Sequence, residues 1–158
     1  MNNALMFSSK SDEWSTPQDL FDRLHAEFNF QVDAAATAAN TKCPSWYGPG
    51  GSYGWECGID AMTMESAVAP HGDAWAWCNP PYSRGLQARF IEAAAIRREV
   101  VMLLPARTDT KAFHAHIYDA SKWQAREGVE IRLLPGRLRF GGAKAGAPFP
   151  SMVVVFRP

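Results

Sequence analysis

Two runs of five consecutive apolar side chains constrain the fold of this 158-residue chain more than any other feature. They are residues 100–104 (VVMLL) and 152–156 (MVVVF). A strand with one face in water alternates polar and apolar side chains, so a run without polar positions predicts a strand buried on both faces. Sheets covered on both sides are typical of α/β proteins. The predicted fold class is therefore α/β.

Helical and strand patterns alternate along much of the chain. Residues 18–28 carry apolar side chains at helical spacing, and we predict Thr16 as the N-cap and Pro17 as the first helical residue. We expect a short helical turn over 34–40. Because strands alternate with helices and the chain ends in a strand pair, the sequence predicts a mostly parallel sheet with an antiparallel C-terminal edge. The other predicted elements are helices 86–98 and 109–120 and strands 30–33, 74–78, 129–134 and 138–140.

One long segment interrupts this alternation. Residues 43–73 are rich in Gly, Pro and small residues, which predicts a long loop region with one short strand or helix near 58–64. Loops of this length in a compact domain are usually functional or mobile. We expect residues 1–11 to be flexible and residues 1–158 to form a single minimal domain.

Membrane and export signals are missing from the sequence. No apolar run approaches the roughly 20 residues of a membrane span, and the first residues lack a basic-then-apolar signal pattern. We therefore expect a cytoplasmic protein with no membrane partner.

The pattern of cysteines and histidines does not favour a metal site. The three cysteines are odd in number and lack Cys-x-x-Cys spacing, which favours reduced thiols over a zinc site built with His71. His114 and His116 are two residues apart on a predicted helix, where side chains do not share a face. We therefore expect no metal ion. The cysteines are Cys43, Cys57 and Cys78.

Opposite charges are segregated between the two halves of the chain, although the net charge is zero. Residues 1–83 hold three Lys/Arg and ten Asp/Glu, whereas residues 84–158 hold thirteen Lys/Arg and six Asp/Glu. A basic half beside an acidic half is expected where the first binds a polyanion and the second binds a cation. Solvated faces that happen to segregate are the alternative.

The tetrapeptide Asn79-Pro80-Pro81-Tyr82 follows the predicted strand 74–78 and carries the clearest chemical signal. The two prolines remove backbone donors, so the Asn79 amide oxygen and nearby carbonyls leave a corner rich in acceptors. Such a corner can take both hydrogens of a planar amino group, while Tyr82 offers a stacking face. The pattern predicts a site that methylates an exocyclic or amide nitrogen. A plain turn is the alternative for an Asn-Pro-Pro sequence.

Six motifs in order make the whole chain resemble the small phage-type DNA N6-adenine methyltransferases (Dam-like). The resemblance implies a Rossmann-like methyltransferase fold that uses S-adenosylmethionine (SAM) to methylate the N6 atom of adenine in DNA. The motifs are Asp12-Glu13-Trp14-x-Thr16-Pro17, Phe30-x-x-Asp33-Ala34-Ala35-Ala36, Asn40-x-Lys42-Cys43, Gly58-x-Asp60, Asn79-Pro80-Pro81-Tyr82-Ser83 and Leu103-Leu104-Pro105-Ala106-Arg107-x-Asp109-Thr110.

The same resemblance implies a SAM site at the end of strand 30–33. Trp14 can attract the sulfonium through its ring face, and Asp33 is placed to face the cofactor's ammonium. The usual Gly-rich loop is replaced by three alanines, which either serve as small substitutes or leave cofactor affinity weak or dependent on DNA. The implied cofactor residues are Trp14, Thr16, Pro17, Asp33, Ala34, Ala35 and Asp60.

Catalysis in this family implies positioning more than acid–base chemistry. Asn79 and the Pro80 carbonyl would bind the two hydrogens of the adenine amino group and return its lone pair to nitrogen. Tyr82 would stack on the base after it is flipped from the duplex. The implied catalytic residues are Asn79, Pro80, Pro81 and Tyr82.

DNA is the implied partner, and the basic residues of the second half are the implied contacts. We expect residues 136–148 to form a flexible basic loop suited to a groove, and Phe140 to act as a wedge or as a core residue. We expect short or loose sequence specificity, a monomer or weak homodimer, and a role in protecting phage DNA from restriction. The candidate DNA-binding residues are Arg84, Arg107, Lys111, Arg137, Arg139 and Lys144.

Other functions stay open at the level of the sequence. Asn-Pro-Pro-Tyr also suits methylation of an RNA base or of a glutamine side chain in a protein. Cytosine N4 methylation usually has Ser at the position of Asn79. A catalytically inactive DNA-binding remnant is the third alternative, and the missing glycines favour it.

Overall fold

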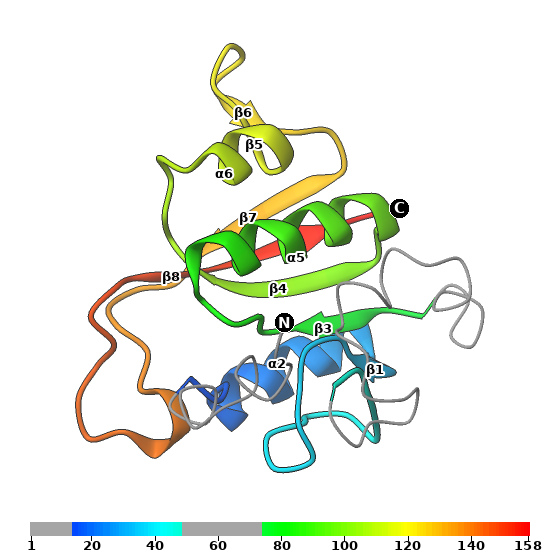
Figure 1. Ribbon diagram of the computed structural model, residues 1–158, viewed down its shortest axis with the longest axis vertical. Coiled ribbons are helices and arrows are strands. Elements are labelled where there is room, and N and C mark those ends of the chain that lie inside the picture. The colour runs from blue at the N-terminus through cyan, green and yellow to red at the C-terminus, as the bar shows by residue number, and fades with distance from the viewer. Residues whose placement is uncertain (1–13, 49–73) are drawn as a thin grey trace.

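The computed structural model describes residues 14–48 and 74–158, which form a three-layer arrangement of a central sheet with helices on both faces (Figure 1). Helix α2 (Gln18–Phe28) covers one face. Helices α5 (Arg84–Arg97) and α6 (Lys111–His116) cover the other. The predictions for residues 1–11, for 58–64 and for Asp60 lie outside the described residues.

The described sheet has six strands in the order β2-β1-β3-β4-β8-β7. Strands β2, β1, β3 and β4 are parallel to one another, whereas β8 pairs antiparallel with both β4 and β7. A mostly parallel sheet with an antiparallel C-terminal edge is therefore confirmed. The strands are β1 (Val32–Asp33), β2 (Ser45–Trp46), β3 (Ala76–Cys78), β4 (Val100–Pro105), β7 (Val129–Leu133) and β8 (Ser151–Phe156).

The apolar run of β4 is buried on both faces, as predicted. Val100, Met102 and Leu104 pack in the core beneath α5 and α6. Val101 and Leu103 pack in the core beneath α2. Successive side chains of a strand point to opposite faces, so a strand between two helical layers needs an apolar residue at every position.

The strand order creates a switch point between β1 and β3. The chain leaves β1 towards β2 on one side, whereas β3 and β4 lie on its other side. Asp33 at the end of β1 is in register with Trp77 of β3, so the carboxyl ends of the two strands are adjacent. Ligands of open α/β sheets bind outside the carboxyl ends of strands at such a point. This edge positions the candidate site.

Helix α2 begins at Gln18, so the prediction of Pro17 as its first helical residue was wrong by one position. The N-cap is Pro17, without a side-chain cap, so the prediction of Thr16 as N-cap was wrong. The Thr16 hydroxyl instead accepts a hydrogen bond from the Asn79 side chain at 3.1 Å. The Thr16 hydroxyl therefore bonds Asn79, which is distant in the sequence, and does not cap α2.

The predicted helix 109–120 ends early, at His116. The chain continues into a two-stranded hairpin, β5 (Tyr118–Asp119) with β6 (Gln124–Ala125). The carboxylate of Asp119 accepts hydrogen bonds from both the backbone and the hydroxyl of Ser121. Local side-chain bonding of this kind competes with helix and favours a turn.

Three further predictions in loop regions need correction. No strand forms over 138–140, because Phe140–Gly142 is a single 3-10 turn with positive φ at its two glycines. A helical turn was expected over 34–40, but the structure has a single turn there, in which the Thr41 amide bonds to the Thr37 carbonyl. Strand β2 lies inside the segment predicted as loop.

Trp77 offers a direct test of this packing. It is fully buried on the α2 side, with ring centroids 5.7 Å from Phe21 and 5.5 Å from Phe30. We expect Trp77→Ala to lower the free energy of unfolding by about 3–5 kcal/mol in urea titrations, because the cavity cannot be refilled. Ile96→Ala, at a side chain 64% exposed, should change it by less than about 0.5 kcal/mol. Equal losses in the two variants would contradict the assigned core.

Candidate active site at the carboxyl ends of β1 and β3

The tetrapeptide connects the end of β3 to helix α5. Strand β3 stops at Cys78, and the helix begins at Arg84 with Ser83 as its extended N-cap. Two consecutive prolines have no N–H to continue a strand ladder, so pairing ends where they begin. Asn79 therefore lies at the carboxyl end of β3, next to the switch point between β1 and β3.

The Asn79 side chain is held in one orientation by three hydrogen bonds. Its Nδ2 donates to the Trp14 carbonyl at 2.7 Å and to Thr16 Oγ1 at 3.1 Å. Its Oδ1 accepts from the Tyr82 hydroxyl at 2.7 Å. A backbone carbonyl only accepts, so the amino side of the amide must face Trp14 and the oxygen must face the other way.

Tyr82 is tied into the same network. Its hydroxyl also lies 3.3 Å from the Leu103 carbonyl, a second acceptor within the neighbouring strand β4. Burial raises the pKa of Tyr82 well above its usual value, with a smaller contribution from Cys78. The hydroxyl therefore stays protonated and acts as a donor to Asn79.

An aromatic cluster formed by Trp14, Tyr82, Phe140 and Phe149 packs over this network. Ring centroids of Trp14 lie 5.3 Å from Phe140 and 5.1 Å from Phe149, and Tyr82 meets both phenylalanines edge-on. The Gly141 amide donates to the Ser15 carbonyl at 2.9 Å. The loop between β7 and β8 is thereby fastened to the segment before α2. Phe140 is a core residue here, 2% exposed.

A pocket of about 250 Å³ adjoins the aromatic cluster on its loop side. Trp14 and Phe140 contribute to its wall, and small loop residues supply the rest. Asn79 and Asp33 do not line it, so it is separate from the hydrogen-bonded corner. The lining residues are Trp14, Phe140, Ala143, Ala145, Gly146, Ala147 and Pro148.

Asp33 ends β1 as a buried carboxyl, 3% exposed. Its Oδ1 accepts from the Ala35 amide at 3.2 Å and its Oδ2 from the Lys42 amide at 3.1 Å. Burial raises the pKa of Asp33 from 3.8 to about 7, against the opposing effect of these two amides and of the Lys42 charge. Each oxygen keeps a lone pair for a further donor.

Strand β1 ends at Asp33, and the three alanines that follow form a bend in place of a Gly-rich turn. The Ala34 amide donates to the Trp77 carbonyl at 2.7 Å, and the Ala36 amide donates to the Tyr47 carbonyl at 3.1 Å. All three side chains are buried, at 0%, 9% and 1% exposure for Ala34, Ala35 and Ala36. Ala34 thus lies beside the end of β3, next to the segment that begins with Asn79.

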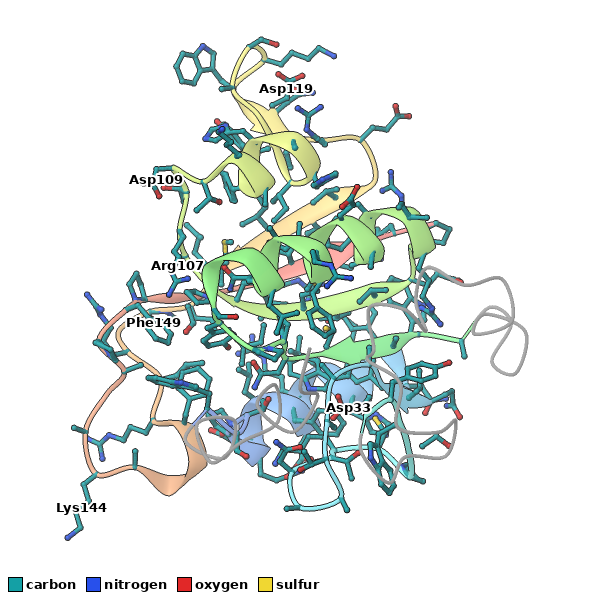
Figure 2. The ribbon with its side chains drawn as sticks, viewed as in Figure 1. Asp33, Arg107, Asp109, Asp119, Lys144 and Phe149 are labelled. Carbon is teal, nitrogen blue, oxygen red and sulfur yellow. The ribbon has the colours of Figure 1, made fainter. Side chains whose placement is uncertain are left out.

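The candidate DNA-binding residues fall into two groups. Arg107 belongs to the site itself, because its Nη1 donates to the Tyr82 carbonyl at 3.1 Å. The side chains of Lys111, Arg137, Arg139 and Lys144 are exposed, and Lys144 extends away from the body at the end of the β7–β8 loop (Figure 2). The placement of the Arg84 side chain lies outside the described residues.

Other arginines of the basic half are engaged with carboxylates. Arg132 forms a two-pronged pair with Glu27 and also bonds Glu130. Arg157 bonds the second oxygen of Glu130. These arginines fix the β7–β8 edge to α2, so the exposed excess of positive charge lies elsewhere.

The described residues contain no cluster of three His, Cys, Asp or Glu side chains suited to a metal ion. Within the same ranges, no helix combines the length and the hydropathy needed to cross a membrane. The Nε2 atom of His114 is hydrogen-bonded to the Thr108 carbonyl at 2.8 Å.

Sequence reasoning missed three contributors to this edge. Phe149 joins the aromatic cluster from a position with no motif around it. The Leu103 carbonyl carries no side-chain signal at all. Gln87 lies one turn into α5, 6% exposed, and its Nε2 has no partner in the part of the chain that the structure describes. A buried donor without a partner is costly, so Gln87 is a candidate ligand contact. A polar residue on an otherwise apolar helix face was its available signal.

The chain matches a known protein family over almost its whole length. A family model described as DNA N-6-adenine-methyltransferase (Dam) matches residues 4–158. The chain belongs to this family. No curated protein and no solved structure matches it.

Membership in the Dam family confirms the resemblance seen in the sequence motifs and covers almost the whole chain. It implies a methyltransferase that acts on adenine N6 in DNA, with SAM as the methyl donor. It assigns no role to any individual residue. The residue roles therefore remain predictions, which the geometry above can make specific.

The buried carboxyl of Asp33 generates a pH prediction. The folded state keeps the Asp33 proton to a higher pH than the unfolded chain does, so between about pH 4 and pH 7 it binds more protons. Stability from this group is therefore present at low pH and is lost as the pH rises, by at most about 1.4 kcal/mol per pH unit. We expect the free energy of unfolding of the parent, minus that of Asp33→Asn, to fall between pH 5 and pH 8.

Urea titrations of both proteins at each pH measure this difference, and subtraction cancels the histidines that the two proteins share. A difference that rises with pH would mean that the Ala35 and Lys42 amides outweigh burial. In that case Asp33 would be an ordinary ionised carboxylate.

Proposed function

We propose that this protein transfers the methyl group of SAM to the N6 atom of an adenine flipped out of DNA, within a Rossmann-like methyltransferase fold. Asn79 Oδ1 and the Pro80 carbonyl accept the two amino hydrogens of the base. The observation that carries the proposal is the fixed orientation of the Asn79 amide, with its nitrogen turned to Trp14 and Thr16. In that orientation Asn79 Oδ1 faces away from Trp14 and Thr16, where it can accept a hydrogen bond from a substrate.

The chemistry of the switch-point edge fits SAM. Asp33 is a buried acid whose charged form lacks a strong partner, and a cationic ammonium beside it would stabilise that form. Trp14 brings an aromatic face to the same edge, where a sulfonium is attracted by the ring. Ala34 and Ala35 are small enough for close approach of a ligand. When bound there, SAM supplies an electrophilic methyl group that leaves a neutral thioether.

The residues of this site would activate the adenine amino nitrogen, which is a weak nucleophile. The adenine amino nitrogen has its lone pair delocalised into the ring. Two acceptors that hold its hydrogens out of the ring plane return that lone pair to nitrogen, and positioning then supplies most of the rate. After transfer, the extra proton on nitrogen passes to an acceptor or to water.

Entry of the amino group requires an exchange of hydrogen bonds at Asn79. The Tyr82 hydroxyl occupies Oδ1 before the base arrives. The Leu103 carbonyl, 3.3 Å from the Tyr82 hydroxyl, can become its sole acceptor. Asn79 Oδ1 then becomes available to the base, and the buried Tyr82 hydroxyl still has a partner. The Tyr82 ring then remains beside the corner, where the base can stack on it.

The exposed basic residues Lys111, Arg137, Arg139 and Lys144 would contact phosphates and hold the duplex while the base is flipped. Site specificity would come from loops. Protection of phage or prophage DNA from restriction is the biological role that fits a small adenine methyltransferase of this type.

Nucleoside mass spectrometry tests the proposed reaction. Unmethylated DNA incubated with SAM and the parent protein should gain N6-methyladenine, whereas Asn79→Ala should lower the rate by about a hundredfold or more, because the acceptor and its positioning are both lost. Ile96→Ala serves as the matched control and should behave as the parent. Methylcytosine would overturn the base assignment, and methylation of RNA or protein in place of DNA would overturn the substrate.

Thr16 distinguishes a positioning role from a cofactor-binding role. Thr16→Val keeps the shape but removes the acceptor from Asn79 Nδ2, so we expect kcat to fall roughly tenfold while the Kd for SAM stays the same. Thr16→Ser keeps the hydroxyl and should restore most of the rate. A weaker Kd for SAM with unchanged kcat would instead assign the hydroxyl to the cofactor, as the sequence resemblance implied.

A further inference from the structure

The β5–β6 hairpin carries a large apolar side chain into solvent. Trp123 is 82% exposed in the four-residue loop that joins Asp119 to Gln124. The hairpin projects from the body beyond α6, with its loop at the extreme end of the molecule (Figure 1). An indole this exposed contributes little to the stability of the fold and leaves its ring face free for a partner, and Trp is enriched at interfaces.

The loop holds Trp123 outward at a conformational cost. Its φ is +56°, in the left-handed region that bulky side chains rarely adopt. Asp119 organises the loop by accepting from the amide of Ser121 at 3.0 Å and from its hydroxyl at 2.6 Å. The Lys122 amide closes the turn on the Asp119 carbonyl at 3.2 Å. Strain that the surroundings enforce is a recognised sign of function.

The base of the hairpin is anchored firmly to the fold. The Arg126 guanidinium bonds the His114 carbonyl at the end of α6, and the Arg126 amide bonds the Ile117 carbonyl at 2.9 Å. The Tyr118 ring stacks on Phe113 with 5.8 Å between centroids. The tip is therefore presented by a rigid support, which lowers the entropy lost when a partner binds.

Charge and position favour DNA as that partner. Lys122, next to Trp123, keeps its side chain 69% exposed while lying 3.8 Å from Asp119. Along the long axis of the molecule, Asp119 of the hairpin and Lys144 of the β7–β8 loop lie at opposite ends, with Arg107 and Asp109 between them (Figure 2). The hairpin therefore lies along the same axis as Arg107 and Lys144, two of the candidate DNA-binding residues.

We propose that the hairpin tip is a second DNA-binding site, at which Trp123 packs on base and sugar edges flanking the target and Lys122 contacts a phosphate. This inference rests on the proposed function. It assigns to a short chain an additional contact outside the catalytic corner. Aromatic contacts with nucleic acid bases typically contribute enough for a several-fold to hundredfold change in affinity.

Binding of a fluorescein-labelled DNA duplex, followed by anisotropy, tests the site. We expect Trp123→Ala to raise the Kd about tenfold and Trp123→Phe to raise it less, because a smaller ring is kept. Leu133→Ala is the matched control, since Leu133 is 73% exposed on β7, and it should leave the Kd unchanged. Urea titrations should show equal stability for all three variants, because neither side chain is packed.

Salt dependence separates the two residues of the tip. Trp123→Ala should leave the slope of log Kd against log salt unchanged, because an apolar contact releases no counterions. Lys122→Gln should reduce the magnitude of the slope by about one, as expected for the loss of one phosphate contact. Equal slopes for Lys122→Gln and the parent would remove the phosphate contact from the proposal.

Two results would overturn the inference for different reasons. If the parent methylates DNA and Trp123→Ala binds the duplex as the parent does, the hairpin is not a DNA contact and the proposed function stands. Self-association of the parent that Trp123→Ala abolishes, measured by sedimentation, would then assign the tip to an interface between copies. If the parent neither binds nor methylates DNA, both proposals fail.

Discussion

The hydrogen bonds from Asn79 to the Trp14 carbonyl and the Thr16 hydroxyl join the two halves of the site. The partner segment precedes α2 and Asn79 follows β3, so the bonded residues lie 65 and 63 positions apart in the sequence. Because a carbonyl cannot donate, this contact fixes which end of the amide is left to face a substrate. At the other end of the amide, Oδ1 accepts the Tyr82 hydroxyl, which also lies 3.3 Å from the Leu103 carbonyl.

Desolvation sets the electrostatics of the neighbouring strand end. Asp33 is buried with two amide donors, which is too few to offset the loss of water, and its pKa rises to about 7. A structural turn could have used an asparagine or serine at no such cost. An acid kept at this position is better explained by a ligand that carries positive charge, because such a ligand would make the ionised form favourable.

The sequence predicted the parts of the fold that depend on local pattern. The apolar runs of β4 and β8, helix α2 and the position of Asn79 after a strand were all readable, because each depends on spacing within a few residues. Partners distant in sequence were not. Nothing local shows that the Thr16 hydroxyl serves Asn79 instead of capping α2, or that Phe149 reaches Tyr82. The β5–β6 hairpin was hidden because His114 to Ala120 still fits a helical pattern, and only the Asp119–Ser121 bonding breaks it.

Under the proposed function, the loop between β7 and β8 would link DNA contact to access at the Asn79 corner. Its outer surface carries Arg137, Arg139 and Lys144, whereas its inner side contributes Phe140 and Phe149 to the aromatic cluster around Tyr82. The Gly141 amide also bonds the Ser15 carbonyl, within the segment that orients Asn79. Binding of a duplex to these basic residues would therefore shift Phe140 and Phe149, whose rings pack against Tyr82. Under the proposed function, this loop would couple binding of the DNA backbone to release of the Asn79 acceptor.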